Sequence, residues 1–245
     1  MVQITFAGSG DAFGSSGRMN TCIIVDAPGT RFAIDFGASS LIALSKLGIA
    51  HNSIDTILLT HLHGDHGGGI PPMLIDAMLG AKREAPLKIA GPPGTRAWLA
   101  EVQEALFPGS SGMSPKFGLV IEELCIGGPH LIGDLKVTTW PAVHTAETNP
   151  TQIRVEVAGK TIAYTGDGSW TEDTLKLADH ADVLITECYF YSKPVKYHMN
   201  YPDIQANRDR LNAKRLILTH MGPEMLDNAN RIAEECAYDG MIIEI

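Results

Sequence analysis

The segment His61-Leu62-His63-Gly64-Asp65-His66 restricts the fold and chemistry of this chain more than any other part of its sequence. It places three imidazoles and a carboxylate within six residues, directly after the apolar run Thr56–Thr60. Protonated imidazoles this close would repel one another, and neutral ones each need a partner for a lone pair. A divalent cation meets both conditions, and neutral imidazole with ionised carboxylate suits zinc. The alternative is a histidine-rich surface loop.

Four such ligands cannot all reach one tetrahedral ion without strain, so the segment predicts two neighbouring ions. Each ion then needs ligands from elsewhere, and three candidates follow predicted strands: His144, Asp167 and His220. Each has an ordinary alternative, because a lone histidine is more often a hydrogen-bonded core or surface group and Gly-Asp-Gly is a common turn. Sheets of α/β proteins usually place their sites at the carboxyl ends of strands. The shared position of the three residues therefore favours metal ligands.

The pattern of apolar residues predicts an α/β chain with mixed sheets. Strands are expected at Val2–Ala7, Thr21–Asp26, Arg31–Asp35, Thr56–Thr60, Leu87–Ala90, Leu119–Leu124, Leu135–Trp140, Gln152–Val157, Thr161–Thr165, Val183–Thr186, Arg215–Thr219 and Met241–Glu244. Helices are expected at Ser39–Leu47, Pro71–Leu79, Gly94–Phe107, Thr171–Leu177, Asp203–Leu211 and Glu224–Ala237. Three glycines, Gly67–Gly69, would let the backbone turn tightly before the helix at Pro71. The Gly-, Ser- and Pro-rich segment Pro108–Gly118 is typical of a surface loop, and no linker divides the chain, so we expect a single domain over residues 1–245.

The sequence contains one internal similarity. Thr56–Leu62 (TILLTHL) and Arg215–Met221 (RLILTHM) each carry an apolar run that ends in Thr-His. Two similar halves, each supplying a histidine from the end of a buried strand, would explain it. Chance similarity between two apolar strands would explain it as well.

The composition excludes several classes of protein. With 245 residues, 44% of them hydrophobic, the chain can bury a large core and is not disordered. Its 19 basic and 28 acidic residues give a formal charge of −9, which disfavours nucleic acid as a partner. We expect a small anionic substrate, which the positive field of the metals would attract despite the acidic surface. Four scattered cysteines are typical of free thiols in a reducing compartment. Since we find neither a signal-peptide pattern nor an apolar run of roughly 18 residues, we expect a cytoplasmic protein without a membrane span.

The order HLHGDH, His144, Asp167 in TGD and His220 in LTHMG resembles the motifs of the metallo-β-lactamase-fold hydrolases. The resemblance runs from GSGDAFG near the start to the last strand, and its six-residue motif is highly specific. It implies a four-layer αβ/βα sandwich of two mixed β-sheets flanked by helices, with the metals at one edge between the sheets. It also implies the ligand sets: His61, His63 and His144 for one ion, Asp65, His66 and His220 for the other, and Asp167 bridging both.

A weaker constellation resembles the ribonuclease Z and phosphonate-pathway phosphodiesterase branch of that family. In the segments ADVLITECYFY and YHMN, Glu187 and His198 match a glutamate and the non-ligand histidine that it orients against the phosphate. The alternative is that His198 lies on an exposed loop and Glu187 caps a turn. Two departures disfavour tRNA processing: Thr186 replaces a histidine of ribonuclease Z, and the basic arm that grips tRNA has no counterpart. Residues 107–134 carry a single cation, Lys116.

These observations predict a dinuclear metal-dependent hydrolase, a phosphodiesterase that acts on a small phosphodiester through a hydroxide bridging the metals. Asp65, Glu187 and His198 are the predicted catalytic residues, with His198 stabilising charge on the phosphate or protonating the leaving group. We expect two zinc ions, although manganese or iron could occupy similar ligands. The first alternative is a carbonyl-ester hydrolase acting on a lactone, β-lactam or thioester, and the second is a non-catalytic metal-binding protein. Relatives of this kind are often dimers, which leaves a homodimer open.

Overall fold

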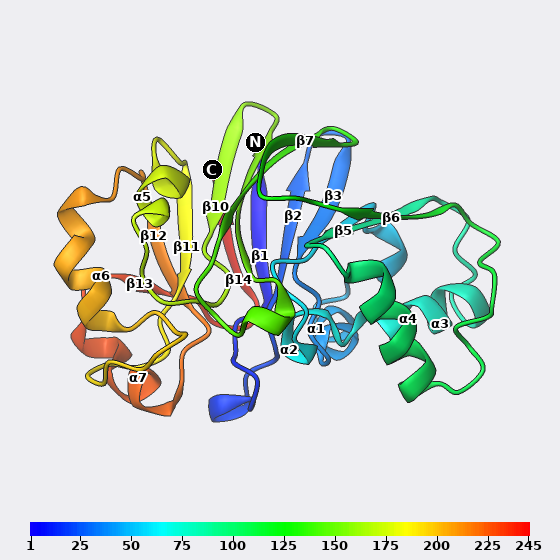
Figure 1. Cartoon of the computed structure of the whole chain (residues 1–245), viewed down its shortest axis with the longest axis horizontal. Helices are drawn as coiled ribbons and strands as arrows, with labels where there is room; N and C mark the ends of the chain where they lie inside the picture. Colours follow the sequence, from blue (N-terminus) through cyan, green and yellow to red (C-terminus); the bar gives the residue numbers. More distant parts are fainter.

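The computed structural model describes residues Met1–Ile245, whose strands form two seven-stranded sheets at the centre of the molecule (Figure 1). The first sheet has the order β14-β1-β2-β3-β4-β5-β6 and the second the order β13-β12-β11-β10-β9-β8-β7. The strands of the first sheet are β1 (Gln3–Gly8), β2 (Cys22–Ala27), β3 (Thr30–Ile34), β4 (Thr56–Leu58), β5 (Leu87–Gly91), β6 (Leu119–Glu123) and β14 (Met241–Glu244). Those of the second are β7 (Gly127–Ile132), β8 (Leu135–Pro141), β9 (Thr151–Val157), β10 (Lys160–Tyr164), β11 (Val183–Glu187), β12 (Leu216–Thr219) and β13 (Glu235–Cys236).

The helices cover the outer faces of the two sheets, on the right and left of Figure 1. Beside the first sheet are α1 (Ser40–Lys46), α2 (Gly64–Gly67), α3 (Ile70–Leu79) and α4 (Thr95–Leu106), and beside the second are α5 (Asp173–Ala178), α6 (Tyr201–Asn207) and α7 (Pro223–Asn228). Three apolar cores separate the four layers, one between the sheets and one under each set of helices. The expected four-layer αβ/βα sandwich with mixed sheets is confirmed.

The strands contain continuous runs of apolar residues because both of their faces are covered by other layers. In β2, Ile23 and Val25 belong to the core between the sheets, together with Val155 of β9. The alternate residue Ile24 packs in the core with Leu44 of α1. Successive side chains of a strand point to opposite faces, so a strand buried on both sides must be apolar throughout.

The two sheets repeat one pairing pattern. From β14 to β3 all neighbours are antiparallel, and from β3 to β6 all are parallel. The second sheet is antiparallel from β7 to β10 and parallel from β10 to β13. The two sheets are therefore similar halves, in which β4 corresponds to β11 and β5 corresponds to β12. The two Thr-His segments leave strands that do not correspond, so their likeness does not come from this repeat.

Some predicted elements are wrong. The helix expected at Glu224–Ala237 ends at Asn228, and the chain then returns to the sheet as β13. The amide of Ala237 donates to the carbonyl oxygen of Leu218 over 2.7 Å, and Ala237 is buried between the sheets. The sequence analysis also missed β7, because Gly127-Gly128-Pro129 breaks its apolar pattern. An edge strand accommodates proline, since its outer backbone groups need no partner.

The turn expected at Gly67–Gly69 is also different. Gly64–Gly67 form the short helix α2, and α3 begins at Ile70, one residue before the expected start at Pro71. No helix combines the length and the apolar character that a membrane crossing requires.

Candidate metal centre

The predicted metal ligands all lie just beyond the carboxyl ends of strands. His61 follows β4 in the first sheet, and the other remote ligands, His144, Asp167 and His220, follow β8, β10 and β12 in the second sheet. The structure brings all seven predicted ligands into two groups, in each of which the ligand atoms lie within 4.8 Å of one another. The groups are His61, His63 and His144, and Asp65, His66, Asp167 and His220.

The first group turns three imidazole nitrogens toward one another. The Nδ1 atom of His63 lies 3.1 Å from Nε2 of His61 and 3.2 Å from Nε2 of His144. The Nδ1 atom of His144 lies 2.7 Å from the carbonyl oxygen of Tyr197, and that of His61 lies 3.1 Å from Oγ1 of Thr60. Because a carbonyl oxygen only accepts, His144 carries a proton on Nδ1 and keeps the lone pair of Nε2 for a metal.

The second group combines two histidines with two carboxylates. The Nε2 atom of His66 lies 3.4 Å from Oδ2 of Asp65 and 3.3 Å from Oδ1 of Asp167. The Nε2 atom of His220 lies 3.2 Å from Oδ2 of Asp65 and 3.3 Å from Oδ2 of Asp167. The two oxygens of Asp167 therefore face two histidines of the same group, and the role of Asp167 as a bridge between two ions stays a prediction.

Three atoms of this group are buried without a hydrogen-bond partner: Nε2 of His66, Oδ1 of Asp167 and Nδ1 of His220. The first two lie 3.3 Å apart. An unsatisfied buried polar atom costs about 1–3 kcal/mol, so a structure seldom keeps two of them side by side. A divalent cation would supply the missing partner for both. The residues present therefore fit a metal pair, with imidazole and carboxylate donors of the kind that zinc, manganese and iron accept.

Asp35 supports the second group through a hydrogen bond with His66, although it is not one of the predicted ligands. The sequence analysis did not identify it. Its Oδ2 lies 2.7 Å from Nδ1 of His66, while its Oδ1 accepts the backbone amide of Thr60 over 2.8 Å. Asp35 is fully buried and has a φ of 57°, in the left-handed region that few residues other than glycine adopt. Its position at the end of a predicted strand, similar to that of the metal ligands, was the only signal in the sequence, and a single aspartate at such a position is equally typical of a turn.

Electrostatics differ between the two groups. Burial lowers the pKa of His61, of His63 and of His144, which favours the neutral imidazole that a metal requires. Burial also acts to lower the pKa of His220, but Asp167 and Asp65 outweigh it and raise this pKa to about 9. The buried carboxylates of the second group thus attract positive charge, whether it is carried by a proton or by a cation.

Glu187 and His198 form a hydrogen-bonded pair beside both groups. Glu187, at the end of β11, is fully buried; its Oε1 accepts the amide of Gly168, and its Oε2 lies 2.9 Å from Nδ1 of His198. Although burial acts to lower the pKa of His198, the hydrogen bond that His198 donates to Glu187 raises it. The ring of His198 stacks on Tyr189 at 4.9 Å and lies 5.1 Å from the ring of His144, so it is not the exposed loop residue of the alternative interpretation.

The glycine-rich segment after β1 forms a turn next to the site. The carbonyl oxygen of Ser9 accepts the amide of His220 over 3.1 Å, which holds His220 at its left-handed φ of 53°. A Cβ atom on Gly8 would lie 1.9 Å from the carbonyl oxygen of Asn20. Glycine is required there because two backbone segments approach too closely for a side chain.

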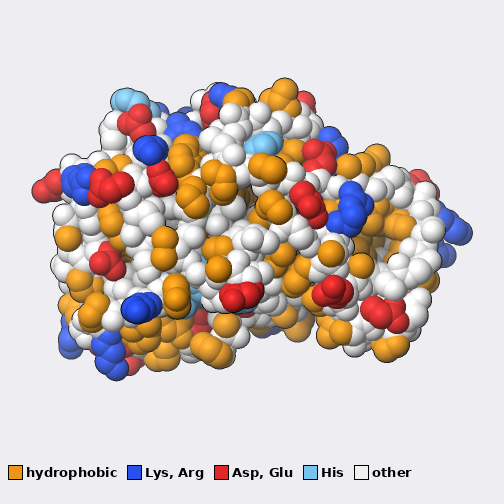
Figure 2. Space-filling view, in the orientation of Figure 1, with side chains coloured by type: hydrophobic (Ala, Val, Ile, Leu, Met, Phe, Trp, Pro, Cys, Tyr) orange, Lys and Arg blue, Asp and Glu red, His pale blue; other side chains and the backbone are white.

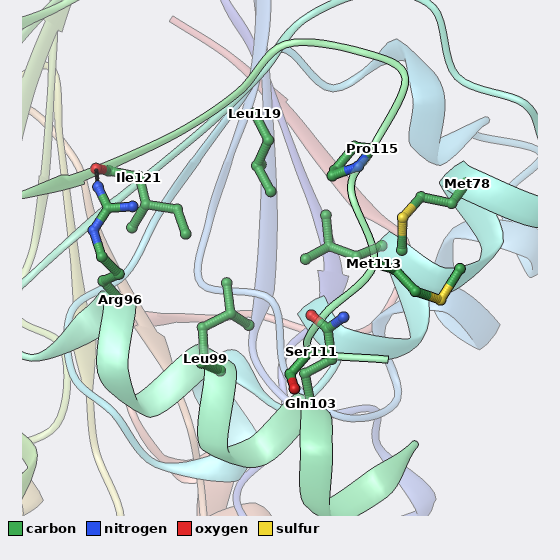
Figure 3. Close-up of a pocket in the computed structure, with 11 residues that line it drawn as sticks. Met78, Arg96, Leu99, Gln103, Ser111, Met113, Pro115, Leu119 and Ile121 are labelled. Atoms are coloured by element: carbon green, nitrogen blue, oxygen red, sulfur yellow. Dashed lines mark hydrogen bonds between the residues drawn. The ribbon is translucent and has the colours of Figure 1, made fainter. Parts of the chain in front are cut away.

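A separate cavity of about 160 Å³ lies away from the metal centre (Figure 3). Leu99 and Gln103 of α4, Met113 of the 108–118 loop and Leu119 of β6 point into it. None of its lining residues belongs to the ligand groups, so it is not part of the metal centre.

Comparisons with known proteins found a matching family model, related sequences and structures of similar fold. A family model described as "Anti-Pycsar protein Apyc1" matches residues 2–237. Ribonuclease Z of Methanothermobacter thermautotrophicus is 35% identical over 144 residues, which cover 59% of this chain and 45% of that relative. Human tRNase Z, short form, superposes with a TM-score of 0.80 at 24% identity over 99% of both chains. The metallo-beta-lactamase fold protein YhfI from Bacillus subtilis superposes with a TM-score of 0.78 at 20% identity over the whole of both chains.

Proposed function

The chain belongs to the family described as anti-Pycsar protein Apyc1, and from this membership and the geometry of the site we propose that it is a metal-dependent phosphodiesterase acting on a small phosphodiester. One observation carries the proposal. Glu187 and His198 lie within 4.8 Å of Asp167 and His220, so a proton-carrying histidine faces the same space as a metal centre. Ribonuclease Z and tRNase Z, the relatives described above, are nucleases by name, which supports attack on phosphorus.

His61, His63 and His144 would hold one ion, and Asp65, His66 and His220 the other, with Asp167 between them. We infer that both ions are zinc, because imidazole nitrogens and carboxylate oxygens are the usual donors in catalytic zinc sites. When bound, the metal pair would supply a water acidic enough to act at neutral pH and positive charge beside the phosphate oxygens.

His198 is the proposed proton carrier. Its Nδ1–H donates to Glu187, which fixes the ring and leaves Nε2 free to face a substrate. The raised pKa of His198 favours the protonated ring at neutral pH. In that form Nε2–H can donate to a phosphate oxygen or deliver a proton to the leaving oxygen.

Asp65 is the proposed partner of the attacking water. The charge of His66 and the hydrogen bond from His220 outweigh burial and hold the pKa of Asp65 far below its usual range. An ionised carboxylate accepts hydrogen bonds only, so Asp65 would orient a water molecule by accepting a hydrogen bond from it.

The charge distribution supports a small substrate. The formal charge is −9, and on the face shown in Figure 2 the Lys and Arg side chains lie scattered among acidic ones. Long nucleic acids bind through gathered positive charge, whereas one phosphate group needs only the local field of the metal centre.

A substrate panel tests this proposal. Zinc-loaded protein is assayed with bis(p-nitrophenyl) phosphate, p-nitrophenyl acetate, a lactone and a thioester. We expect kcat/KM for the diester to exceed that for every carbonyl ester by at least about tenfold, and His198→Ala to lower only the diesterase activity. Preference for a carbonyl ester, with no effect of His198→Ala, would establish the alternative hydrolase instead.

A further inference from the structure

A cavity of about 520 Å³ adjoins the metal centre and has no role in the mechanism described so far. Its walls come from the connections β5–α4, β6–β7 and β8–β9, and His144 is one of its lining residues. Its volume falls in the range of about 300–1,000 Å³ that is usual for small-molecule sites. The cavity is therefore large enough for part of a substrate whose phosphate lies at the metals.

The lining of this cavity is uncharged. No Asp, Glu, Lys or Arg is among its 11 residues. Two of them, Ile126 and Val143, are apolar side chains that are 54% and 48% exposed. Exposed apolar side chains that line the same cavity are typical of a site where a ligand covers them.

Hydrogen bonds fix the cavity relative to the metal ligands. The amide and Oγ1 of Thr151, in its wall, both donate to the carbonyl oxygen of Thr60, over 2.9 and 2.8 Å. The amide of Leu62 donates to the carbonyl oxygen of Thr148 over 3.2 Å. Thr60 and Leu62 flank His61, so these hydrogen bonds connect the β8–β9 wall of the cavity directly to the segment that carries His61.

We propose that this cavity binds the uncharged organic group esterified to the phosphate, an inference that rests on the proposed phosphodiesterase function. His144 connects the metal centre and the cavity. Its Nε2 faces His61 and His63, and His144 is also one of the residues that line the cavity. Val143 directly precedes His144 in the chain, so the apolar wall begins one residue from this predicted ligand. A charged ester group is disfavoured, because burying a charge without a partner costs several kcal/mol.

Isothermal titration calorimetry with two stable phosphodiesters tests the inference without relying on turnover. Zinc-loaded protein is titrated with diphenyl phosphate and with dimethyl phosphate, which share the charged group and differ in apolar area. We expect diphenyl phosphate to bind at least about tenfold more tightly. In Val143→Asp and in Ile126→Asp, on two different walls, this preference falls to about one. The matched control is Leu131→Asp, on β7, because Leu131 is 74% exposed and lies outside the cavity, so the preference stays at the wild-type value.

Equal affinities in the wild type, no binding of either diester, or a preference that survives both wall substitutions would overturn the inference. Failure of the proposed function has a different signature. In that case diphenyl phosphate binds with the expected preference, but the protein does not hydrolyse bis(p-nitrophenyl) phosphate.

Discussion

The Oδ2 atom of Asp35 lies 2.7 Å from Nδ1 of His66, and both side chains are completely buried. Asp35 thereby fixes the orientation of His66 and directs its Nε2 toward Asp65 and Asp167. Carboxylates behind ligating histidines set both the tautomer and the basicity of the ring.

Asp35→Ala is therefore expected to weaken metal binding by about 10–100-fold, the usual effect of removing such a carboxylate. Competition with a chromophoric chelator measures the affinity. Asp134→Ala serves as the control, because Asp134 is exposed and precedes β8, at the opposite end of that strand from His144. An unchanged affinity in Asp35→Ala would show that His66 is not a ligand held by Asp35.

His198→Ala should lower kcat for bis(p-nitrophenyl) phosphate by about 10²–10⁴-fold, the usual contribution of a general acid or base. Metal content, measured by mass spectrometry, should stay at the wild-type value, because His198 is outside the two ligand groups. Loss of metal in this variant would make His198 a ligand and not a proton carrier.

Glu187→Gln should shift the pH profile. Glu187 raises the pKa of His198, so removing its charge lowers that pKa. If His198 acts in its protonated form, the pH above which activity declines moves to a lower value in Glu187→Gln. A profile of kcat against pH measures this shift. If activity declines at the same alkaline pH in Glu187→Gln and in the wild type, Glu187 does not affect the reaction through His198.

Gly37→Ala should destabilise the site by steric conflict. A Cβ atom on Gly37 would lie 2.1 Å from the carbonyl oxygen of Asp65 and 2.5 Å from Cβ of Asn20. We expect a loss of about 1–3 kcal/mol in the free energy of unfolding, measured in urea, together with weaker metal binding. Gly64→Ala is the control, since nothing lies within 4 Å of a Cβ atom at Gly64. Equal stability of the two variants would contradict the close packing of Gly37.

Asp182 makes a pH-dependent contribution to stability. Burial acts to raise the pKa of Asp182, but the hydrogen bonds from Lys214, over 2.7 Å, and from the amide of Thr161, over 2.9 Å, outweigh it and lower this pKa below its ordinary value of 3.8. A folded pKa below the unfolded one stabilises the fold above the unfolded pKa, and this stabilisation is lost as the pH falls through the folded pKa. Asp182→Asn should thus cost about 1 kcal/mol at pH 7.

The difference between Asp182→Asn and wild type should shrink below pH 3.8. Urea unfolding at a series of pH values measures it. A difference that stays constant down to pH 2 would show that the charge of Asp182 contributes nothing.

Much of the site could be predicted because its chemistry is concentrated in short segments. The HLHGDH segment holds four ligands within six residues, and His144, Asp167 and His220 could be proposed because each follows an apolar strand. The structure places these residues together, but their roles as ligands remain predictions. Asp35 escaped because one aspartate after a strand has no local pattern to distinguish it from a turn residue.

The fold was predictable where apolar periodicity was strong. Strands buried on both faces, such as β1 and β11, lie where they were expected, within one residue at each end. The helix predicted over Glu224–Ala237 was wrong. Cys236 and Ala237 are positioned by pairing with β12, which is a contact between segments distant in sequence. The repeat of pairing order between the sheets is likewise a property of topology that no local similarity reveals.

The most direct test is a metal titration of chelator-treated protein, with hydrolysis of bis(p-nitrophenyl) phosphate followed as zinc is added. The account predicts no activity without metal and a rate that rises until two equivalents are bound and then stays constant. Hydrolysis that is independent of added metal, or no hydrolysis by protein that has bound two equivalents, would contradict it.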